Sequence, residues 1–297
     1  MVLCAKLVRE SRAATQPALT EEQTYAITPL VEFVHTASLI HDDIEDSADT
    51  RRGKPAAHIT YGLDTALNAG SWLYFEALTC IDRLDANAQT KQKFYALYAQ
   101  ELRRLHLGQA MDIYWHRTPG LFPTTDEYTQ MVHCKTGTLA SLAAKAGFMA
   151  GGADDATIEK AGTIAAALGE GFQILDDVQN LTTGNPGKKR GDDIVEGKKS
   201  LPVLLHIQQT PRDVQKIAAL FARAAQEGID SPAVEECIAL LHSKDAITQA
   251  MERGRQCIEQ NCAALTNCFG TAQTASAATS INELFNGMIL KFQGMAR

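Results

Sequence analysis

The sequence predicts an all-α fold in which the whole chain, residues 1–297, forms one large helical bundle. Apolar residues recur at helical spacing nearly throughout, as in Val31, Val34 and the Leu39/Ile40 pair that follows Ser38. No stretch alternates apolar and polar residues between turn signals, so we expect no strand. Except for the polar stretch from Thr182 to Asp193, the connecting loops are short, and no low-complexity linker divides the chain, which favours a single domain.

Turn residues and acidic helix starts divide the chain into its expected elements. Thr20 precedes two glutamates and Thr125 precedes Asp-Glu, the composition of a first helical turn. Proline and glycine mark the loops near 118–120, 209–211 and 228–232. We therefore expect helices over these ranges: 22–47, 57–84, 90–114, 125–152, 154–182, 196–209, 211–228 and 232–268.

Composition excludes several classes of protein. With 45% hydrophobic and 21% charged residues, the chain has the composition of an ordinary globular protein. Its net charge of −7 disfavours a nucleic-acid partner, and its seven cysteines without a C-x-x-C pair favour a reducing, cytoplasmic location. Lys145 and Glu170 interrupt the most apolar runs, so we expect no membrane span, and we expect no signal peptide at the N-terminus.

Three aspartates follow an apolar helical run near the start of the chain. Asp42 and Asp46 are four residues apart and share one helix face, whereas Asp43 points to the side. Taken alone, such a cluster is more simply a solvated helix end. The preceding turns, VEFVHTASLI, are largely apolar, however, and buried carboxylates need a counter-charge. Because oxygen ligands select a hard divalent ion, the cluster predicts a Mg²⁺ site.

A second cluster of the same form occurs about 130 residues later. In GEGFQILDDVQNL, Asp176 and Asp177 are followed at the i+4 position by Asn180, again after an apolar turn. Two such clusters on separate helices could face each other across a cavity and hold several Mg²⁺ ions between them. Two clusters of matching form are stronger support for a metal site than either alone.

Basic residues recur beside both acidic clusters. Any one of them is most simply a surface charge, but carboxylates and cations at this density indicate metal-bridged phosphate. The positions in question are Arg51, Arg52, Lys54, Lys135, Lys188, Lys189, Arg190, Lys198 and Lys199.

These motifs, in this order, resemble the trans-isoprenyl diphosphate synthases, or polyprenyl synthetases. The matching segments are HDDIEDSADTRRGKP, KTG, GFQILDDVQN and GKKRGDDIVEGKKSLP, within residues 28–205. AAHITYG, GQAMDIYW and the Asn-ended second motif resemble most the geranylgeranyl diphosphate synthase branch. The resemblance implies an all-α bundle of the isoprenoid synthase type with a central active-site cavity. It also implies a homodimer that condenses isopentenyl diphosphate with an allylic diphosphate.

The resemblance assigns roles residue by residue. About three Mg²⁺ ions would be held by the two motifs, namely by Asp42, Asp43, Asp46, Asp176, Asp177 and Asn180. The allylic diphosphate would be held by four basic residues: Arg51, Lys135, Lys188 and Lys198. The reacting carbon would lie beside Lys135, Thr136 and Gln173. The isopentenyl diphosphate would be bound by His35 and Arg52.

The chemistry requires little besides these groups. Ionising a carbon–oxygen bond needs a leaving group whose charge is already stabilised, which metals and cations supply. The allylic cation must then meet a double bond and not water, which requires a dry cavity. We expect the departing diphosphate to take the proton, so no dedicated base is needed. Ala37 and Ser38, small residues just before the first motif, would let a chain longer than C15 pass, unless they only allow close helix packing.

One departure concerns the N-terminal G-K-x-x-R element with which the family binds isopentenyl diphosphate. Lys6 and Arg9 have the right mutual spacing, but no glycine precedes them and they lie too close to the first motif. We expect either that the native N-terminus is longer or that the isopentenyl site is weakened.

Several other functions remain open from sequence. A farnesyl or longer polyprenyl diphosphate synthase would carry the same motifs. A class I terpene cyclase would be expected to have N-D-x-x-S-x-x-x-E in place of the second motif and to lack Arg51, Arg52 and Lys135. A His-Asp phosphohydrolase would need further histidine ligands. A non-catalytic regulatory subunit should have lost acidic residues, whereas this chain keeps five of six, counting both motifs.

Overall fold

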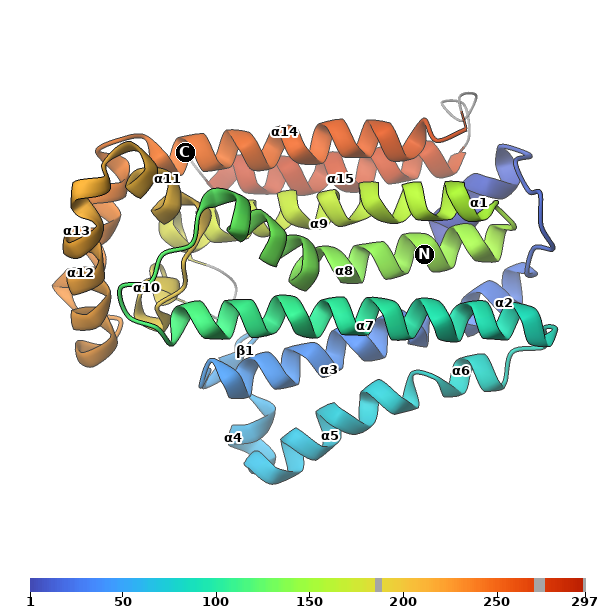
Figure 1. Cartoon of the computed structure of the whole chain (residues 1–297), viewed down its shortest axis with the longest axis horizontal. Coiled ribbons are helices and arrows are strands. Elements are labelled where there is room, and N and C mark those ends of the chain that lie inside the picture. Colours follow the sequence, from blue (N-terminus) through green and yellow to red (C-terminus); the bar gives the residue numbers. More distant parts are fainter. Residues whose placement is uncertain (185–188, 270–275, 296–297) are drawn as a thin grey trace.

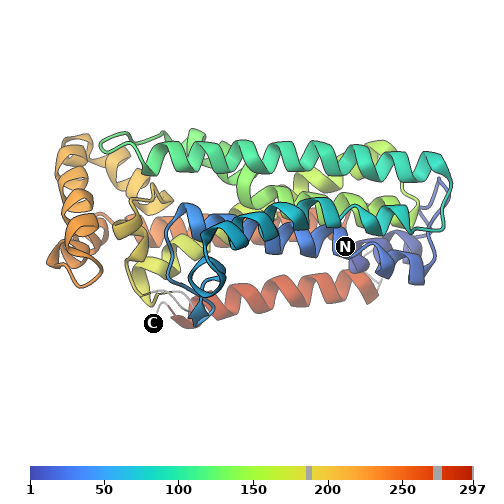
Figure 2. The same cartoon turned by 90° about the horizontal axis from the view of Figure 1, so that it is seen from below.

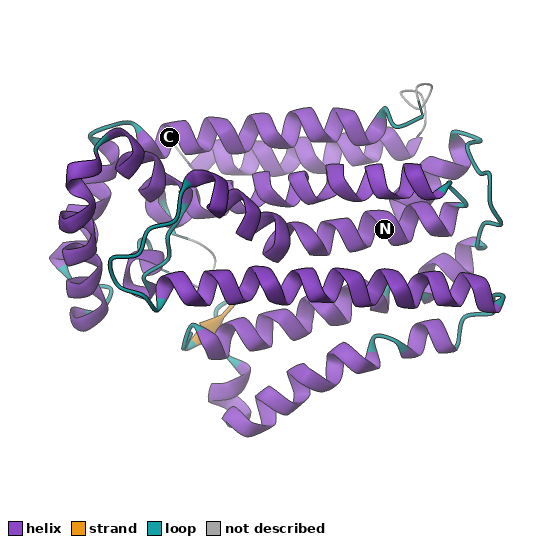
Figure 3. Ribbon diagram, viewed as in Figure 1, coloured by secondary structure: helices purple, strands orange, loops and turns teal. Residues whose placement is uncertain are grey.

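The computed structural model describes residues 1–184, 189–269 and 276–295, with side chains described as far as residue 292, and these residues are predominantly helical (Figure 3). The elements of the first half are α1 (Val2–Glu10), α2 (Glu21–Ala26), α3 (Pro29–Glu45), β1 (Thr50–Arg51), β2 (Lys54–Pro55), α4 (Ala57–Tyr61), α5 (Leu63–Glu76), α6 (Thr79–Asp82), α7 (Ala88–His116) and α8 (Thr125–Gly151). Those of the second half are α9 (Asp155–Thr182), α10 (Asp192–Glu196), α11 (Leu201–Gln209), the 3₁₀ turn η1 (Pro211–Asp213), α12 (Val214–Glu227), α13 (Pro232–His242), α14 (Ala246–Thr266) and α15 (Ser276–Met295).

The long helices α7, α8, α9 and α14 form the body of the bundle, in that order (Figure 1). On one side α3 and α5 pack together and cover α7 and α8, whereas α15 lies on α14 (Figures 1 and 2). The shorter helices α12 and α13 cross one end of the bundle. The predicted all-α class is therefore confirmed, and the helix ranges 90–114, 125–152 and 154–182 agree with α7, α8 and α9 within two residues.

Glycines let the central helices approach closely. A Cβ on Gly108 of α7 would lie 2.3 Å from the backbone nitrogen of Lys135 on α8. A Cβ on Gly137 of α8 would lie 2.7 Å from the carbonyl oxygen of Ala166 on α9, and Gly169 faces Gly137 in turn. Each contact leaves no space for a methyl group. The residues around Lys135 are thus pressed between α7 and α9.

Three apolar clusters make up the core. One joins α3, α5, α7 and α8 around Leu30, Phe94 and Leu142. A second joins α1, α8, α9, α14 and α15 around Phe148 and Ile258. The third lies where α9, α11, α12, α13 and α14 meet. Full burial of each large apolar side chain contributes about 1.5–3 kcal/mol, so these clusters fix the helices that carry the polar residues described below.

Three of the expected long helices are interrupted. The range 22–47 is broken between α2 and α3 because Pro29 has no backbone N–H and begins a new helix. The range 57–84 is broken at Gly62, whose φ of +90° no helix can include, and again after Glu76. The range 232–268 is broken before Asp245, which has a φ of +54°. Thus local backbone geometry overrides the apolar periodicity.

A two-stranded hairpin corrects the expectation that the chain has no strand. Strands β1 and β2 pair antiparallel, with Thr50 opposite Pro55 and Arg51 opposite Lys54. The two turn residues, Arg52 and Gly53, both have positive φ, 53° and 75°, as a tight hairpin requires. Strands of two residues are too short to show alternation, so the sequence pattern could not reveal them.

Candidate active site

The first aspartate cluster lies at the C-terminal end of α3, with Asp42 and Asp43 in the last turn and Asp46 directly after the helix. Asp43 and Asp46 are almost fully buried, and the side chain of Asp42 is 18% exposed. The same helix buries Leu30, Val34 and Ala37, in agreement with the apolar turns that precede the cluster in the sequence. Each of the three carboxylates is paired with a basic residue from a different part of the chain.

The hairpin brings Arg51 onto this cluster. Its Nε atom donates a hydrogen bond of 2.8 Å to Asp43 Oδ1, and its terminal nitrogen reaches Asp42 Oδ2 at 3.4 Å. Arg52 stands at the turn of the hairpin. His35 lies two helical turns before the aspartates and is half buried, and burial and the charges of Arg52 and Arg51 lower its pKa, although Glu32 opposes them.

Lys135 of α8 joins the first cluster to α7. Its Nζ atom lies 3.0 Å from Asp42 Oδ1 and 2.6 Å from Asp112 Oδ2. Burial by itself would raise the pKa of Asp42, but the charges of Lys135, Lys198 and Arg51 outweigh it and hold the pKa well below its usual range. Burial would likewise lower the pKa of Lys135, but the two carboxylates raise it. At neutral pH all three groups are therefore charged.

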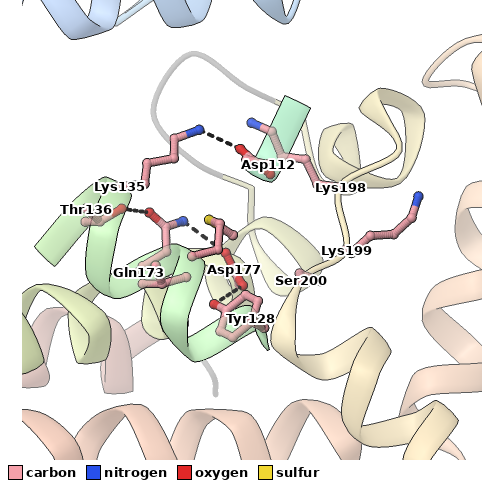
Figure 4. A pocket seen from close by; sticks show the side chains of 11 residues that line it. Asp112, Tyr128, Lys135, Thr136, Gln173, Asp177, Lys198, Lys199 and Ser200 are labelled. Atoms are coloured by element: carbon pink, nitrogen blue, oxygen red, sulfur yellow. Dashed lines mark hydrogen bonds and ion pairs between the residues drawn. The ribbon is translucent and has the colours of Figure 1, made fainter. Parts of the chain in front are cut away.

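Lys198 provides the third pair. Its Nζ atom lies 2.8 Å from Asp46 Oδ2 and 2.9 Å from Glu196 Oε2. Burial raises the pKa of Asp46, opposed by the charge of Lys198. The neighbouring Lys199 extends in a different direction (Figure 4) and lies over the rings of Phe122 and Phe221. Lys188, also expected here, falls outside the described residues.

The second cluster forms a hydrogen-bonded network on α9 (Figure 4). Thr136 Oγ1 donates to Gln173 Oε1 at 2.8 Å, and Gln173 Nε2 donates to Asp177 Oδ1 at 3.0 Å. Asp177 Oδ2 accepts from the Tyr128 hydroxyl at 2.7 Å and from the Leu201 backbone N–H at 3.1 Å. Burial raises the pKa of Asp177 to about 6, although these donors oppose it. Asp177 is thus held by three donors, whereas Asp176 is partly exposed.

Asn180 lies deeper than the two aspartates. Its side chain has no exposed surface, and its Oδ1 atom accepts a hydrogen bond of 3.2 Å from the backbone N–H of Asp193. The oxygen that was expected to face a metal is therefore directed at the segment that leads to Lys198.

A cavity open to solvent lies between α7, α8, α9 and the residues that precede α11. From the second cluster Asp177 lines it, and the other polar residues of its wall include Asp112, Lys135, Thr136, Gln173 and Lys198. Because Lys135 and Lys198 are paired with Asp42 and Asp46, the end of α3 also borders this space. The sequence motifs, which are far apart in the chain, thus converge on one cavity.

Two residues that line the cavity were missed from sequence. Asp112 and Tyr128 were not singled out, although Asp112 interrupts an apolar helix face, which was the available clue. The two other acidic residues near the first motif differ in burial. Glu45 is half buried and accepts a hydrogen bond of 2.5 Å from Gln109, whereas Asp49 is exposed.

Lys6 and Arg9 stay away from the cavity. Lys6 pairs with Glu10 at 3.6 Å, and Arg9 donates to the carbonyl oxygen of Leu19 at 2.8 Å. Helix α1 packs on α8 at Gly147, which is about 18 Å along the helix from Lys135.

The residues expected to control product length lie on the buried side of α3. Ala37 is fully buried in the cluster that contains Tyr74, and Ser38 is partly buried and donates to the carbonyl oxygen of His35 at 2.9 Å. The ring of Tyr74 lies between His41 and His106, at centroid distances of 5.6 and 5.2 Å.

Among the helices of the described residues, none has the length and apolar character needed to cross a membrane.

Comparisons with known proteins agree with this arrangement. The polyprenyl synthetase family model matches residues 2–241. The chain is 34% identical over 246 residues to the geranylgeranyl pyrophosphate synthase dpasD of Apiospora sacchari, covering 81% of this chain and 71% of that protein. It is 36% identical over 217 residues to the geranylgeranyl pyrophosphate synthase ltmG of Epichloe festucae (strain Fl1), covering 72% of this chain but 62% of that protein.

Two solved structures extend the comparison to the fold. The geranylgeranyl pyrophosphate synthetase of Pyrococcus horikoshii Ot3 is 26% identical, with a TM-score of 0.79 over 97% of this chain and 84% of that one. The polyprenyl synthase of Caulobacter crescentus CB15, complexed with calcium and isoprenyl diphosphate, is 26% identical, with a TM-score of 0.73 over 94% of this chain and 84% of that one. The chain therefore belongs to the polyprenyl synthetase family.

Proposed function

We propose that this protein is a Mg²⁺-dependent prenyltransferase that condenses isopentenyl diphosphate with an allylic diphosphate and releases geranylgeranyl diphosphate. The observation that carries the proposal is the pairing of basic and acidic residues around one cavity. Lys135 and Lys198 line it together with Asp177, and each contacts an aspartate of the first motif. Such a site suits a ligand that is itself an anion bridged by cations.

The carboxylates suit a divalent metal ion. Asp42, Asp43 and Asp46 have the oxygen ligands that hard divalent ions prefer. Each forms an ion pair with a basic side chain, so a cation at these positions is stabilised. We infer that they hold Mg²⁺ together with Asp176 and Asp177, about three ions per site. Bound Mg²⁺ would neutralise charge on the diphosphate and so make it a better leaving group.

The basic residues would bind and orient the diphosphates. In this proposal Arg51, Lys135, Lys188 and Lys198 hold the allylic diphosphate, and His35 and Arg52 hold the isopentenyl diphosphate. The hydrogen bond from Thr136 to Gln173 fixes both side chains at the cavity wall, where their oxygen atoms would face the developing allylic cation. The departing diphosphate would accept the final proton.

The assembly is proposed to be a homodimer in which each copy is a single domain spanning residues 1–297. Elements α4, α5 and α7 expose large apolar side chains to an extent that a monomer rarely tolerates. These are Ile59, Tyr61, Leu63, Leu67, Trp72, Phe75, Leu107 and Tyr114. A second copy would cover them. For location we propose the cytoplasm, on the basis of the seven free thiols.

Product sizing tests the proposed activity. The protein is incubated with radiolabelled isopentenyl diphosphate and each of the C5, C10 and C15 allylic diphosphates, with Mg²⁺ or with a chelator, and the products are dephosphorylated and separated by chain length. We expect a C20 product that requires Mg²⁺. A C15 end product would overturn the chain-length assignment, and cyclised hydrocarbon would favour a terpene cyclase. No condensation with any substrate would leave a non-catalytic subunit as the better description.

A pair of matched variants tests the site. Asp42→Asn removes a charge from the cavity side of the first motif, whereas Asp49→Asn removes one from an exposed position seven residues later. Because charge stabilisation at the reacting centre contributes roughly 10²–10³-fold, we expect a loss of that order from Asp42→Asn and little change from Asp49→Asn. Equal activity of the two variants would contradict the assignment.

A further inference from the structure

Asn180 occupies the i+4 position of the second motif, where the resemblance places a metal ligand. The structure surrounds it differently. Its side chain is 0% exposed, and its Oδ1 atom accepts from the backbone N–H of Asp193 at 3.2 Å. Its own carbonyl oxygen accepts from the N–H of Gly191 at 2.9 Å. Asn180 is therefore bonded to residues that precede Lys198 in the chain.

Two hydrogen bonds connect Asn180 to the backbone of Lys198. Asp193 donates to Asn180 through its N–H and accepts through its carbonyl oxygen from the N–H of Lys198, at 2.8 Å. The side chain of Lys198 then reaches Asp46 at 2.8 Å. A change at Asn180 is thus transmitted to a cation that faces the first motif.

The other end of the same segment is held by the same helix. The N–H of Leu201 donates to Asp177 Oδ2 at 3.1 Å. Residues 191–201, which we call the Lys198 segment, are consequently attached to α9 at both ends, by Asn180 and by Asp177. The segment forms these hydrogen bonds through its backbone N–H groups. They therefore fix the path of its backbone and do not depend on its side chains.

The environment of Asn180 favours an amide over a carboxylate. Among the described residues, its Nδ2 atom has no hydrogen-bond partner. An aspartate would place its second carboxylate oxygen at this buried position, with no donor to compensate its charge.

We propose that Asn180 is a positioning residue that holds the Lys198 segment against α9, and that it is not a metal ligand. The expected effect on diphosphate binding rests on the proposed function, in which Lys198 holds the diphosphate. The role of Asn180 in holding the segment rests only on the hydrogen bonds described above.

Three variants separate the two roles. Asn180→Ala removes the acceptor of the Asp193 N–H. Asn180→Asp keeps that acceptor and restores an acidic residue to the motif. Asp176→Asn is the matched control, because it alters a proposed metal ligand one helical turn away. Circular dichroism establishes that each variant remains folded.

Two measurements on the full chain are decisive. Hydrogen exchange with mass spectrometry follows the amides of residues 191–201. Calorimetric titration with inorganic pyrophosphate, at a series of Mg²⁺ concentrations, gives the Mg²⁺ midpoint and the affinity at saturating Mg²⁺. Neither measurement requires prenyl transfer, so a protein without that activity still reveals the role of Asn180.

The expected results differ in direction. Loss of one buried backbone bond should speed exchange in Asn180→Ala about tenfold to a hundredfold and weaken pyrophosphate binding at saturating Mg²⁺, with the Mg²⁺ midpoint within about twofold of wild type. Asp176→Asn should shift the midpoint and leave exchange unchanged. Asn180→Asp should bind Mg²⁺ no more tightly than wild type. A shifted midpoint in Asn180→Ala with unchanged exchange, or tighter Mg²⁺ binding in Asn180→Asp, overturns the proposal.

Discussion

Lys135 Nζ lies 3.0 Å from Asp42 Oδ1, although 93 residues separate the two in the chain. The same nitrogen lies 2.6 Å from Asp112 Oδ2, so one ammonium group ties α3, α7 and α8 together. A buried pair of this kind contributes little over an apolar replacement, but removing one partner leaves the other charge uncompensated.

Replacing Lys135 by methionine should therefore be costly at neutral pH. With Asp42 and Asp112 left uncompensated, we expect the free energy of unfolding in urea to fall by about 3 kcal/mol. Lys135 lowers the pKa of both carboxyls in the folded protein, so the stability they contribute is present at neutral pH and lost as pH falls. The deficit of the variant should therefore stay constant between pH 7 and pH 5 and shrink only as pH falls below about 4, the ordinary pKa of an aspartate.

The double variant Lys135→Met with Asp112→Asn provides the control. It also removes the charge of Asp112, which Lys135 no longer compensates, and should recover part of the lost free energy of unfolding. A deficit that is as large near pH 3 as at pH 7 would contradict the electrostatic explanation.

Gly108→Ala should disturb the same region through packing. The added methyl group would lie 2.3 Å from the backbone nitrogen of Lys135, which cannot move aside as a flexible side chain would. We expect a loss of about 3 kcal/mol in the free energy of unfolding, together with reduced activity. Gly287→Ala on α15 is the matched control, because its Cβ meets nothing within 4 Å. That variant should be neutral or gain up to about 1 kcal/mol from helix propensity. Equal effects would exclude a packing cause.

The stability of the protein should depend on Lys199 in alkaline solution. This side chain is 6% exposed, lies 5.1 Å from the ring centroids of Phe122 and Phe221, and burial lowers its pKa from 10.5 to about 8. The unfolded chain therefore binds more protons between pH 8 and 10.5, and the stability contribution of Lys199 rises with pH across that window.

Comparison with Lys199→Met isolates this contribution. Relative to the variant, the wild type should gain about 3 kcal/mol in the free energy of unfolding as pH rises through the window. Lys216→Met, at a half-exposed lysine, should show no such trend. A flat difference between wild type and Lys199→Met would mean that the ammonium is not destabilised by burial.

Charges introduced on α5 should break the proposed dimer. Trp72 and Phe75 are 56% and 73% exposed, and a glutamate at both positions cannot be buried against a second copy. We expect sedimentation analysis to show a dimer for the wild type and a monomer for the double variant. Leu290→Glu, on an apolar position of α15 that is 66% exposed, should remain dimeric. Dissociation by Leu290→Glu alone would place the interface on α15.

An aromatic residue at position 38 should shorten the product. Ser38 is only partly buried, so a larger side chain fits there more easily than at the fully buried Ala37. Ser38→Phe should shift the main product from C20 towards C15 in the same sizing experiment. An unchanged product would place the length control elsewhere along the cavity, for instance at Tyr74.

The sequence predicted the long helices best, because in these segments apolar residues recur on the same helix face over many turns. Helices α7, α8 and α9 follow from their periodicity because each buries a continuous stripe. The breaks at Pro29, Gly62 and Asp245 were missed because the apolar pattern continues across these residues, whereas their backbone does not allow the helix to continue. The hairpin at 50–55 was missed because a two-residue strand has no period.

The candidate site was predictable only as far as its motifs are local. Spacing along one helix placed Asp42 and Asp46 on a common face, but no spacing indicates that Asp112 shares Lys135 with Asp42. That contact depends on how closely α7 and α8 approach, which Gly108 decides. Asn180 illustrates the same limit, since its partner is a backbone N–H thirteen residues away.

Arg51, Lys135 and Lys198 are ion-paired with the aspartates of the first cluster. These three side chains therefore compete with any metal ion for the same carboxylates. Any divalent ion that takes the carboxylates must displace them, and every displacement frees a cation for an incoming anion. Under the proposed function, metal and diphosphate binding would then be linked equilibria, in which each ligand raises the affinity for the other by the same factor. Either ligand titrated alone would consequently bind more weakly than in the presence of its partner.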